Sequence, residues 1–549
     1  MSFDRDDGVR RLATESFDVV VIGGGITGVG CALDAASRGL RTALVERYDF
    51  ASGTSSKSSK LVHGGLRYLQ QREIRLVYEA LAERQVLRRI APHLVRVQPF
   101  LLPVFTSDGL INRRLARALD SAMWMYDMTG GLRIGKLHRR ISKDKALAHM
   151  PTLRGSRLAS AYIYYDARAD DARLTLTVAK TAAENGAAIV NDAAVVGFDK
   201  DPAGRVNGVR VVVDGNEIAV KTRAVVNATG VWSDNVRALD EGRDPDSIRP
   251  AKGVHITVPW AKVRNDIAAV VPVPKDRRSV FVVPWGDFTY IGTTDTDYDG
   301  PLDDPQCTPD DIAYLLRAIN GAVTTPLDES DILGTWAGLR PLVKAAGSER
   351  TADLSRRHSV TTSASGVVTV TGGKLTTYRR MAADAIDTVA GALGPPEHRG
   401  VRNRGPKSRT ARLPLSGARG WNSLGLPEHL ASRYGSDGEA VRRLVQEQPD
   451  LAEPIVPGLS YSKAEVVYAA RAEMARSVDD VLARRTRARL LARDASADAA
   501  DEVARLIGPV LGWSPEQQEA SAAAYRALVD AERASAHLPE TALDAALGA

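Results

Sequence analysis

FDVVVIGGGITGVGCALDAASRGLRTALVE, residues 17–46, decides the fold of this chain. Its first residues are mostly β-branched, which predicts a parallel strand buried on both faces. Gly23 permits a tight turn, Gly25 lets the backbone approach a pyrophosphate, and Gly28 lets the following helix pack close to the strand. Glu46 ends the second strand, where a carboxylate accepts hydrogen bonds from ribose hydroxyls. This order predicts a dinucleotide-binding unit and leaves open whether the dinucleotide is FAD or NAD.

The composition is that of an ordinary globular protein. The 549 residues are 44% hydrophobic and 26% charged, and the length allows about three units with their own cores. No apolar run is long enough to cross a bilayer and the polar start is no signal peptide, so we expect a cytoplasmic location. Cys31 and Cys307 are the two cysteines, which indicates neither a disulfide framework nor a metal site. The net charge of +6 suits nucleic acid, anionic lipid or an anionic substrate without choosing among them.

Strand and helix patterns alternate through about the first 390 residues, which predicts an α/β architecture. A helix is predicted over residues 170–184, with Asp170 or Asp171 as its N-cap. A late segment, GVVTVTGGKLTTYRRMAADAI at 366–386, repeats the order of strand, glycine turn and helix. The predicted strands are residues 17–22, 187–196, 206–213 and 217–228, with a further strand region at 279–295.

The C-terminal part of the chain has a different pattern. Residues 394–417 are rich in proline, glycine and arginine without periodicity, which predicts a linker. The arginine-rich segment RRTRARLLAR, residues 484–493, is typical of the solvent-facing side of an amphipathic helix, so we do not expect nucleic-acid binding. Ser514 is a predicted N-cap. The predicted helices of this separate domain are residues 429–448, 463–493, 497–507 and 515–534.

The most specific stretch is DFASGTSSKSSKLVHGGLRYLQQREIRLVYEALAER, residues 49–84. Its small hydroxylated residues can lie along a cofactor, and its HGG turn lets backbone come close to a flat group. Taken alone, the serines are equally typical of a solvated surface loop. Four further motifs accompany this stretch: KGVHI at 252–256, WAGLRPL at 336–342, LSRRHSV at 354–360 and TGGKLTTYR at 371–379.

With these motifs the chain resembles the FAD-dependent glycerol-3-phosphate dehydrogenases, the aerobic, quinone-linked type. The resemblance covers about residues 17–535 and implies the glycine and D-amino-acid oxidase fold, in which FAD lies across a Rossmann-like domain under a β-rich cap. It also implies an all-α C-terminal domain. The implied parts are an oxidoreductase domain at 17–395 (FAD-binding at about 17–63, 155–235 and 345–395; cap at about 64–154 and 236–344), a linker at 396–417 and a helical domain at 418–535.

The resemblance also implies which residues form the site. The substrate-binding residues are Arg67, Tyr68, Arg356 and Lys374, with His255 and Arg340 as catalytic residues. Arginine suits a phosphate because its planar fork donates two hydrogen bonds, although a surface salt bridge is the alternative for each arginine taken singly. The implied FAD-binding residues are Gly23, Gly25, Ile26, Thr27, Gly28, Glu46, Thr54, Ser55, Ser59, Lys60, Leu61, His63, Gly64, Gly65, Gly230, Gly373, Lys374, Leu375 and Thr376.

Oxidation of an alcohol removes a hydride from carbon and a proton from oxygen. His255 is the better candidate base because imidazole titrates near working pH, while His63 would serve the flavin. Arg340 stays protonated and can act only by stabilising an alkoxide. A core or surface role is the alternative for both histidines. The chain departs from the bacterial pattern at Val254, where serine is frequent, and at ARADDARL (167–174), which lacks an aromatic residue before the aspartates.

Quinone is dissolved in the membrane, so a quinone-linked enzyme has to dock there. Residues 111–128, INRRLARALDSAMWMYDM, mix apolar, aromatic and arginine side chains as an interfacial helix would, and a cap helix packed on protein is the alternative. We therefore expect peripheral association with the inner face of the cell membrane, glycerol 3-phosphate and quinone as partners, and a homodimer as one possible assembly. Alternative functions are an oxygen-reducing glycerol-3-phosphate oxidase, an amino-acid oxidase and a flavin-containing protein that binds nucleic acid.

Overall fold

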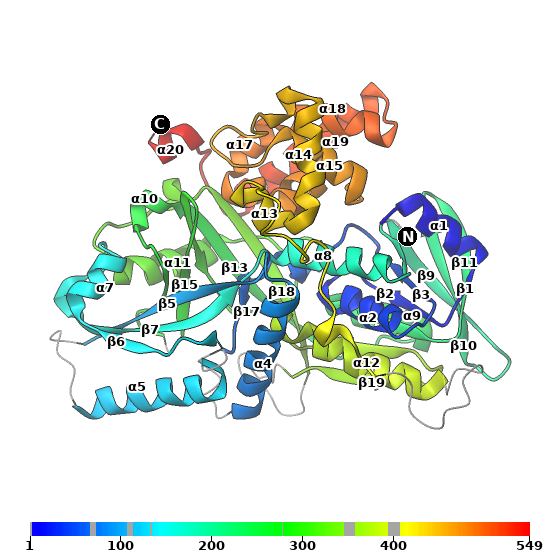
Figure 1. Cartoon of the computed structure of the whole chain (residues 1–549), viewed down its shortest axis with the longest axis horizontal. Helices are drawn as coiled ribbons and strands as arrows, with labels where there is room; N and C mark the ends of the chain where they lie inside the picture. The colour runs from blue at the N-terminus through cyan, green and yellow to red at the C-terminus, as the bar shows by residue number, and fades with distance from the viewer. Residues whose placement is uncertain are drawn as a thin grey trace.

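Two α/β parts lie side by side, and a helical C-terminal domain lies across both (Figure 1). In Figure 1 the part that contains the opening stretch is on the right, a second part built on a large sheet is on the left, and the C-terminal helices, orange to red, are at the top. The structure is a computed structural model, and it describes residues 3–65, 73–106, 113–131, 134–276, 278–344, 357–393 and 407–548.

The opening stretch forms the centre of a six-stranded sheet of order β19-β20-β12-β2-β3-β8. Each residue of β2 is buried, as predicted, because the sheet is covered on both faces. Helices α2 (Ile26–Ser37), α8 (Asp171–Glu184) and α12 (Tyr378–Leu393) cover one face. The strands are β2 (Val19–Ile22), β3 (Thr42–Val45), β8 (Ala188–Val190), β12 (Val225–Asn227), β19 (Ser359–Thr362) and β20 (Val368–Thr371).

A four-stranded sheet of order β1-β11-β10-β9 packs on the other face of the six-stranded sheet, together with α1 (Arg5–Thr14). The predicted strand 206–213 is confirmed as β10. The predictions of unbroken strands at 17–22, 187–196 and 217–228 were wrong. Each breaks where the chain leaves one sheet for the other, a change of layer that a strand pattern in sequence does not reveal. The strands of this sheet are β1 (Ser16–Phe17), β9 (Ala193–Lys200), β10 (Val206–Val213) and β11 (Asn216–Thr222).

The second part is built on a ten-stranded sheet, and its two faces carry different helices. Helices α7 (Lys143–His149) and α11 (Pro309–Ala322) pack on one face, and α4 (Ile74–Ile90) and α5 (Arg113–Tyr126) pack on the other. The strand region predicted at 279–295 forms two antiparallel strands of this sheet. The strands are β4 (Leu61–Val62), β5 (Arg96–Phe105), β6 (Arg139–Ile141), β7 (Leu158–Arg168), β13 (Ile248–Pro259), β14 (Ala268–Pro272), β15 (Ser279–Trp285), β16 (Phe288–Gly292), β17 (Thr296–Asp297) and β18 (Gly334–Val343).

The C-terminal domain is helical, as predicted, but its helices are shorter. The prediction of one helix over 463–493 was wrong, because the helix ends at Ala472 and Arg487 adopts a left-handed backbone conformation. The predicted helix 429–448 is interrupted at Gly435, where φ is +60°. Ser514 is confirmed as an N-cap. The helices are α13 (Glu428–Tyr434), α14 (Gly438–Glu447), α15 (Lys463–Ala472), the π-helix η11 (Asp480–Arg485), α16 (Ala488–Leu491), α17 (Arg493–Asp498), α18 (Ala500–Leu511), α19 (Pro515–Ser535) and α20 (Leu543–Leu547).

The arginine-rich segment does not face solvent, and this prediction was wrong. Arg485, Arg487 and Arg493 are among the largest fully buried side chains of the chain. Arg484 and Arg485 form ion pairs with Asp49, which lies about 435 residues earlier in the chain. Buried charge is tolerated only where it is paired, and the partners here come from another part of the fold. The sequence of the segment alone does not indicate that Asp49 is a partner of its arginines.

Part of the predicted linker packs on the first domain. Residues 407–417 are described, and residues 394–406 lie outside the described part. The amide of Leu415 donates to the carbonyl of Ile90 at 2.8 Å, and the Leu415 side chain is buried in the core that α2 and α12 share. Within the described ranges, no helix has the length and apolar character needed to span a membrane.

Candidate active site

A cavity of about 620 Å³ lies between the six-stranded sheet and the ten-stranded sheet. It contacts both glycine turns and strands β13 and β18, which are more than 200 residues apart in sequence from the first turn. Most of the predicted site residues meet here: Gly23, Gly25, Ile26, Thr27, Glu46, Thr54, Ser55, Ser59, Leu61, His63, Gly230, His255, Arg340, Gly373, Lys374, Leu375 and Thr376.

The first glycine turn has the close approaches that were predicted. Gly23 adopts φ +108°, and a Cβ built on Gly28 would lie 1.9 Å from the carbonyl oxygen of Gly23. The helix α2 therefore begins tight against the end of β2, and its first residues line the cavity. The Ile26 amide donates to the Ser55 hydroxyl at 2.9 Å, which ties the serine-rich loop to this end of the helix. A helix N-terminus open to a cavity suits the pyrophosphate of a dinucleotide.

Glu46 lines the cavity and holds the turn at the same time. Its two carboxylate oxygens accept from the backbone amides of Gly24 at 2.5 Å and Tyr48 at 2.9 Å. Burial raises the pKa of the Glu46 carboxyl, against the opposing effect of these two hydrogen bonds. A carboxylate at the end of the second strand is the group that bonds ribose hydroxyls in dinucleotide-binding folds.

The second glycine turn forms the opposite wall, with the strand, turn and helix order that the sequence predicted. Gly372 and Gly373 adopt φ +73° and +78°, conformations that favour glycine. Lys374 follows them and lines the cavity. The His63 amide donates to the Thr376 hydroxyl at 3.2 Å, so the HGG segment is held against this turn. Two helix ends with glycine turns, facing one cavity, fit an extended FAD molecule.

His255 lies on β13, is 2% exposed and faces the cavity. A hydrogen bond of 2.8 Å joins its Nε2 to the Ser59 hydroxyl, and its ring stacks on Trp336 with centroids 4.8 Å apart. Among the described residues its Nδ1 has no hydrogen-bond partner. Burial lowers the pKa of His255 well below its ordinary value, and the cations of Lys60 and Arg340 lower it further. The imidazole is therefore neutral at pH 7 and able to accept a proton.

Arg340 lies on β18, the neighbour of β13, and lines the cavity. Its guanidinium is oriented by Asp295 at 3.0 Å and by the Thr293 hydroxyl at 3.3 Å. The Arg340 side chain is 22% exposed, so it is accessible from the cavity. A positively charged group fixed in this way can stabilise negative charge on a bound ligand.

Some predicted site residues lie elsewhere. Lys60 does not line the cavity; its Nζ donates to Asp171 at 3.1 Å and lies 4.6 Å from the centre of the Trp336 ring. Gly28, Gly64 and Gly65 also do not line it. A Cβ on Gly64 would lie 2.5 Å from Leu81, so this glycine serves packing. Arg67, Tyr68 and Arg356 lie outside the described residues.

Trp336 is the neighbour of His255 that the sequence did not identify. It stands opposite His255 in the antiparallel register of β13 and β18, and this pairing places the two rings face to face. The WAGLRPL motif contains Trp336, but the sequence does not show that Trp336 pairs with His255, because the register of the two strands cannot be read from it. Among the described residues no group of histidine, cysteine, aspartate and glutamate side chains forms a metal site.

Comparisons with known proteins agree with this geometry. The family described as "FAD dependent oxidoreductase" matches residues 18–379, and "C-terminal domain of alpha-glycerophosphate oxidase" matches residues 408–518. Glycerol-3-phosphate dehydrogenase 2 of Mycobacterium tuberculosis (strain ATCC 25618 / H37Rv) is 43% identical over 97% of this chain and 91% of its own.

Two solved structures are similar as well. The glycerol-3-phosphate dehydrogenase from Bacillus halodurans, complexed with FAD, is 30% identical, with a TM-score of 0.76 over 97% of both chains. Glycine oxidase from Geobacillus kaustophilus, 20% identical with a TM-score of 0.53 over 70% of this chain and 100% of its own, shows the shared fold alone.

Proposed function

This chain belongs to the family of FAD-dependent glycerol-3-phosphate dehydrogenases, and we propose that it oxidises sn-glycerol 3-phosphate to dihydroxyacetone phosphate and passes the electrons to a membrane quinone. Its cofactor is FAD. The observation that carries the proposed reaction is the meeting of neutral His255 with Arg340 and Lys374 in the cavity that both glycine turns line.

Different residues of the chain have different roles in the proposed reaction. His255 takes the proton from the substrate hydroxyl, since burial keeps its imidazole neutral at working pH. Arg340 stabilises the negative charge that develops on the substrate oxygen. Lys374, which precedes α12, supplies positive charge to the substrate phosphate. Arg67 and Arg356, beyond the described residues, would do the same, and Tyr68 would donate a hydrogen bond. Bound FAD would supply the acceptor for the hydride that leaves the carbinol carbon.

The test of this function is anaerobic addition of glycerol 3-phosphate to the purified yellow protein. Loss of the visible absorbance of the flavin is the expected result, and a quinone analogue should restore it. Alanine and glycine, added instead, should leave the absorbance unchanged, which separates this function from an amino-acid oxidase. An occupied flavin that glycerol 3-phosphate does not reduce would exclude the proposal.

The electron acceptor requires its own measurement. An oxidase would reoxidise the reduced flavin with oxygen at each turnover and release one hydrogen peroxide per substrate. We expect turnover in air without a quinone to be slow, and turnover with a quinone analogue to be fast. Stoichiometric peroxide at a rate equal to the quinone rate would instead identify an oxygen-reducing oxidase.

We predict that Arg340→Ala lowers kcat/KM for glycerol 3-phosphate by about 10- to 100-fold, because it removes one charged hydrogen bond to the substrate. FAD should remain bound in the variant. Arg249→Ala is the matched control, because Arg249 forms a half-exposed ion pair with Asp297 near the same strands and such pairs contribute little. Unchanged kcat/KM, or a colourless Arg340→Ala protein, would show that Arg340 has another role.

We also propose peripheral docking on the inner face of the cell membrane through α5. Trp124, on α5, is 52% exposed, and Met128, just after α5, is 74% exposed; the neighbouring helix α4 exposes Ile74 and Tyr78. In Figure 1 these two helices form the edge of the molecule farthest from the C-terminal domain. Exposed tryptophan and methionine beside basic residues are typical of a surface that binds the headgroup region of a bilayer. Arg117, on α5, is exposed as well.

The proposed docking surface predicts that substitutions on it weaken binding to membranes. Trp124→Ala combined with Met128→Asp should lower binding to anionic vesicles at low salt by about tenfold or more. The double substitution removes apolar area that would be buried in the bilayer, and it adds a negative charge. Leu424→Asp is the control, since Leu424 is also an exposed apolar residue, at 39%, and belongs to the C-terminal part of the chain. Sedimentation with vesicles measures both. Equal binding by the two variants would place the docking surface elsewhere.

The extents of the domains are proposed from the same comparisons. The match over 18–379 supports an oxidoreductase domain, for which we propose residues 17–395. The match over 408–518 supports a helical domain, for which we propose residues 418–535; this match begins within residues 396–417, the proposed linker. A homodimer is proposed as the assembly. Light scattering of the purified protein measures the mass and distinguishes a dimer from a monomer of 59.0 kDa.

A further inference from the structure

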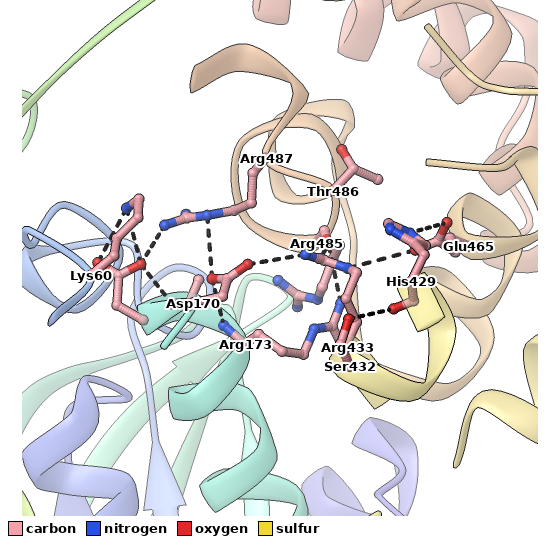
Figure 2. Close-up of polar contacts among 12 residues, drawn as sticks. Lys60, Asp170, Arg173, His429, Ser432, Arg433, Glu465, Arg485, Thr486 and Arg487 are labelled. Carbon is pink, nitrogen blue, oxygen red and sulfur yellow. Dashed lines mark hydrogen bonds and ion pairs between the residues drawn. The ribbon is translucent and has the colours of Figure 1, made fainter. Parts of the chain in front are cut away.

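The C-terminal domain contacts the oxidoreductase domain through buried charged groups. Figure 2 shows Arg433 and Arg487 of the C-terminal domain pointing toward Asp170 of the oxidoreductase domain, to which they form ion pairs of 3.1 and 3.4 Å. Arg487 is fully buried, and its Nη1 donates to the carbonyl of Ala483 at 3.0 Å. These side chains cross from the late helical segment to the loop that follows the first glycine unit.

Asp171 is the centre of this contact and is also fully buried. Its carboxylate accepts from the Ser58 amide at 2.9 Å and the Ser58 hydroxyl at 2.7 Å. Lys60 donates to the same carboxylate at 3.1 Å, and the Arg487 guanidinium donates to it as well. Asp170, not Asp171, caps α8 through its side chain. The Asp171 carboxylate also accepts from the amide of Ala172 at 3.0 Å, so it joins the loop and Arg487 to the first turn of α8.

Arg487 also contacts the loop directly. Its Nη2 donates to the carbonyl of Ser56 at 2.8 Å, the carbonyl to which Lys60 donates at 3.1 Å. Arg487 and Lys60 both adopt left-handed backbone conformations, φ +69° and +55°, which are uncommon for residues other than glycine. Such conformations persist where the surrounding contacts hold them in place. The loop from Ser56 to Lys60 is thus held at one end by Arg487, which bonds the Ser56 carbonyl, and at the other by Asp171, which bonds Lys60.

The loop also contacts His255, the proposed base. The Ser59 hydroxyl bonds Nε2 of His255 at 2.8 Å, and the hydroxyl of Tyr290 donates to the Ser59 carbonyl at 2.9 Å. Trp336, which stacks on His255, donates its indole N–H to the Ser58 carbonyl at 3.1 Å. Of the two neighbours that orient the His255 ring, Ser59 belongs to the loop and Trp336 is hydrogen-bonded to it at Ser58.

We propose that Arg487 is a positioning residue for the oxidation, and that through Asp171 and Ser56 it fixes the loop 56–60 so that Ser59 and Trp336 hold His255 toward the cavity. The C-terminal helical domain then completes an active site whose substrate and cofactor contacts all lie in the other domain. The inference rests on the proposed function, since it assigns His255 the role of the base.

Docking of the two domains does not depend on Arg487 alone. Arg484 and Arg485 bond Asp49 at 2.5 and 2.7 Å, and Arg173 of α8 forms a buried ion pair with Glu473. These contacts remain when Arg487 is replaced. A variant at Arg487 is therefore expected to keep the domains together while it releases the loop.

The test compares Arg487→Met with Arg493→Met. Both arginines are fully buried in the C-terminal domain, but Arg493 pairs with Asp494 of the same domain and its side chain does not contact the loop. Anaerobic stopped-flow reduction of the flavin at saturating glycerol 3-phosphate gives the rate. We expect a rate about 10²-fold lower in Arg487→Met, because a displaced base loses its alignment with the substrate. Arg493→Met should reduce at the wild-type rate, with FAD bound in both.

Two further measurements distinguish a role of Arg487 in positioning His255 from a role in the stability of the protein. The acid limb of the rate should move to higher pH in Arg487→Met, because water admitted around His255 relieves the burial that lowers its pKa, while Lys60 and Arg340 still face it. Diethyl pyrocarbonate should modify His255 faster, measured by peptide mass, and this needs no substrate. Arg487→Lys should restore part of the rate, since an ammonium can still reach Asp171. If Arg487→Met does not fold, Asp171→Asn replaces it in the same comparison.

The outcomes distinguish the two proposals. A wild-type flavin that glycerol 3-phosphate does not reduce overturns the proposed function, and the modification rate of His255 then decides the positioning role alone. A reducible wild type with equal rates, equal pH profiles and equal modification in Arg487→Met and Arg493→Met overturns the positioning role. Loss of FAD in proportion to the loss of rate also overturns it, because the effect would then be on cofactor binding.

Discussion

Replacing His255 with glutamine is expected to lower the rate of flavin reduction by glycerol 3-phosphate by about 10²- to 10⁴-fold, which is the usual contribution of a general base. Glutamine keeps a polar group that can bond Ser59 but cannot accept the substrate proton. The FAD content should be unchanged, because His255 is held by protein groups, the Ser59 hydroxyl and the Trp336 ring. Anaerobic stopped-flow absorbance at saturating substrate measures the loss.

The pH dependence of the wild-type enzyme follows from the same residue. His255 must be neutral to accept a proton, and burial holds its pKa well below the ordinary value of 6.5. The rate at saturating substrate should therefore stay level as pH falls through 6.5 and decline only below it. Saturating substrate is needed because the second pKa of a phosphate monoester is about 6 and would shape kcat/KM.

His149→Gln is the control for the His255 variant. His149 also lies in the cap part of the molecule, but its ring bonds the exposed carboxylate of Asp266. Its replacement should leave the reduction rate unchanged. A His255→Gln rate within about threefold of wild type, or a wild-type acid limb above pH 6.5, would assign the base to another group.

Gly28→Ala is expected to abolish FAD binding and yield a colourless protein. A Cβ at this position would lie 1.9 Å from the carbonyl oxygen of Gly23 and 3.0 Å from its carbonyl carbon. Backbone cannot yield there as a flexible side chain would, so α2 must move away from the end of β2. That movement displaces the helix N-terminus from the phosphates it would bind. The ratio of flavin to protein absorbance after purification measures the result.

Gly391→Ala is the matched control for this prediction. Gly391 lies in α12, where an added Cβ would meet no atom within 4 Å, and its backbone is helical. Alanine there should keep FAD bound and increase stability by about 0.5–1 kcal/mol, since glycine is unfavourable within a helix. A yellow Gly28→Ala protein with wild-type FAD affinity would show that the turn can relax.

Local features of the sequence were predicted well because they act over a few residues. The glycine turn after β2, the helix that follows it and the N-cap at Ser514 each depend on near neighbours, and all three are confirmed. The second glycine turn was predicted for the same reason. Helix and strand ends were predicted less well. Strands break where the chain changes sheet, and α15 ends at Ala472, two residues before Met474 adopts a positive φ of 54°.

The sequence by itself predicted a dinucleotide site at the glycine turn of residues 23–28, and its longer motifs identified the family and FAD. Only the tertiary structure decided that Arg485 and Arg487 are buried, that Trp336 stacks on His255, and that Asp171 holds the loop before the active site. The physical reason is that a turn or a cap is satisfied by adjacent residues. A buried charge is stable only beside a partner, and here the partner of Arg487 lies 316 residues away in the sequence.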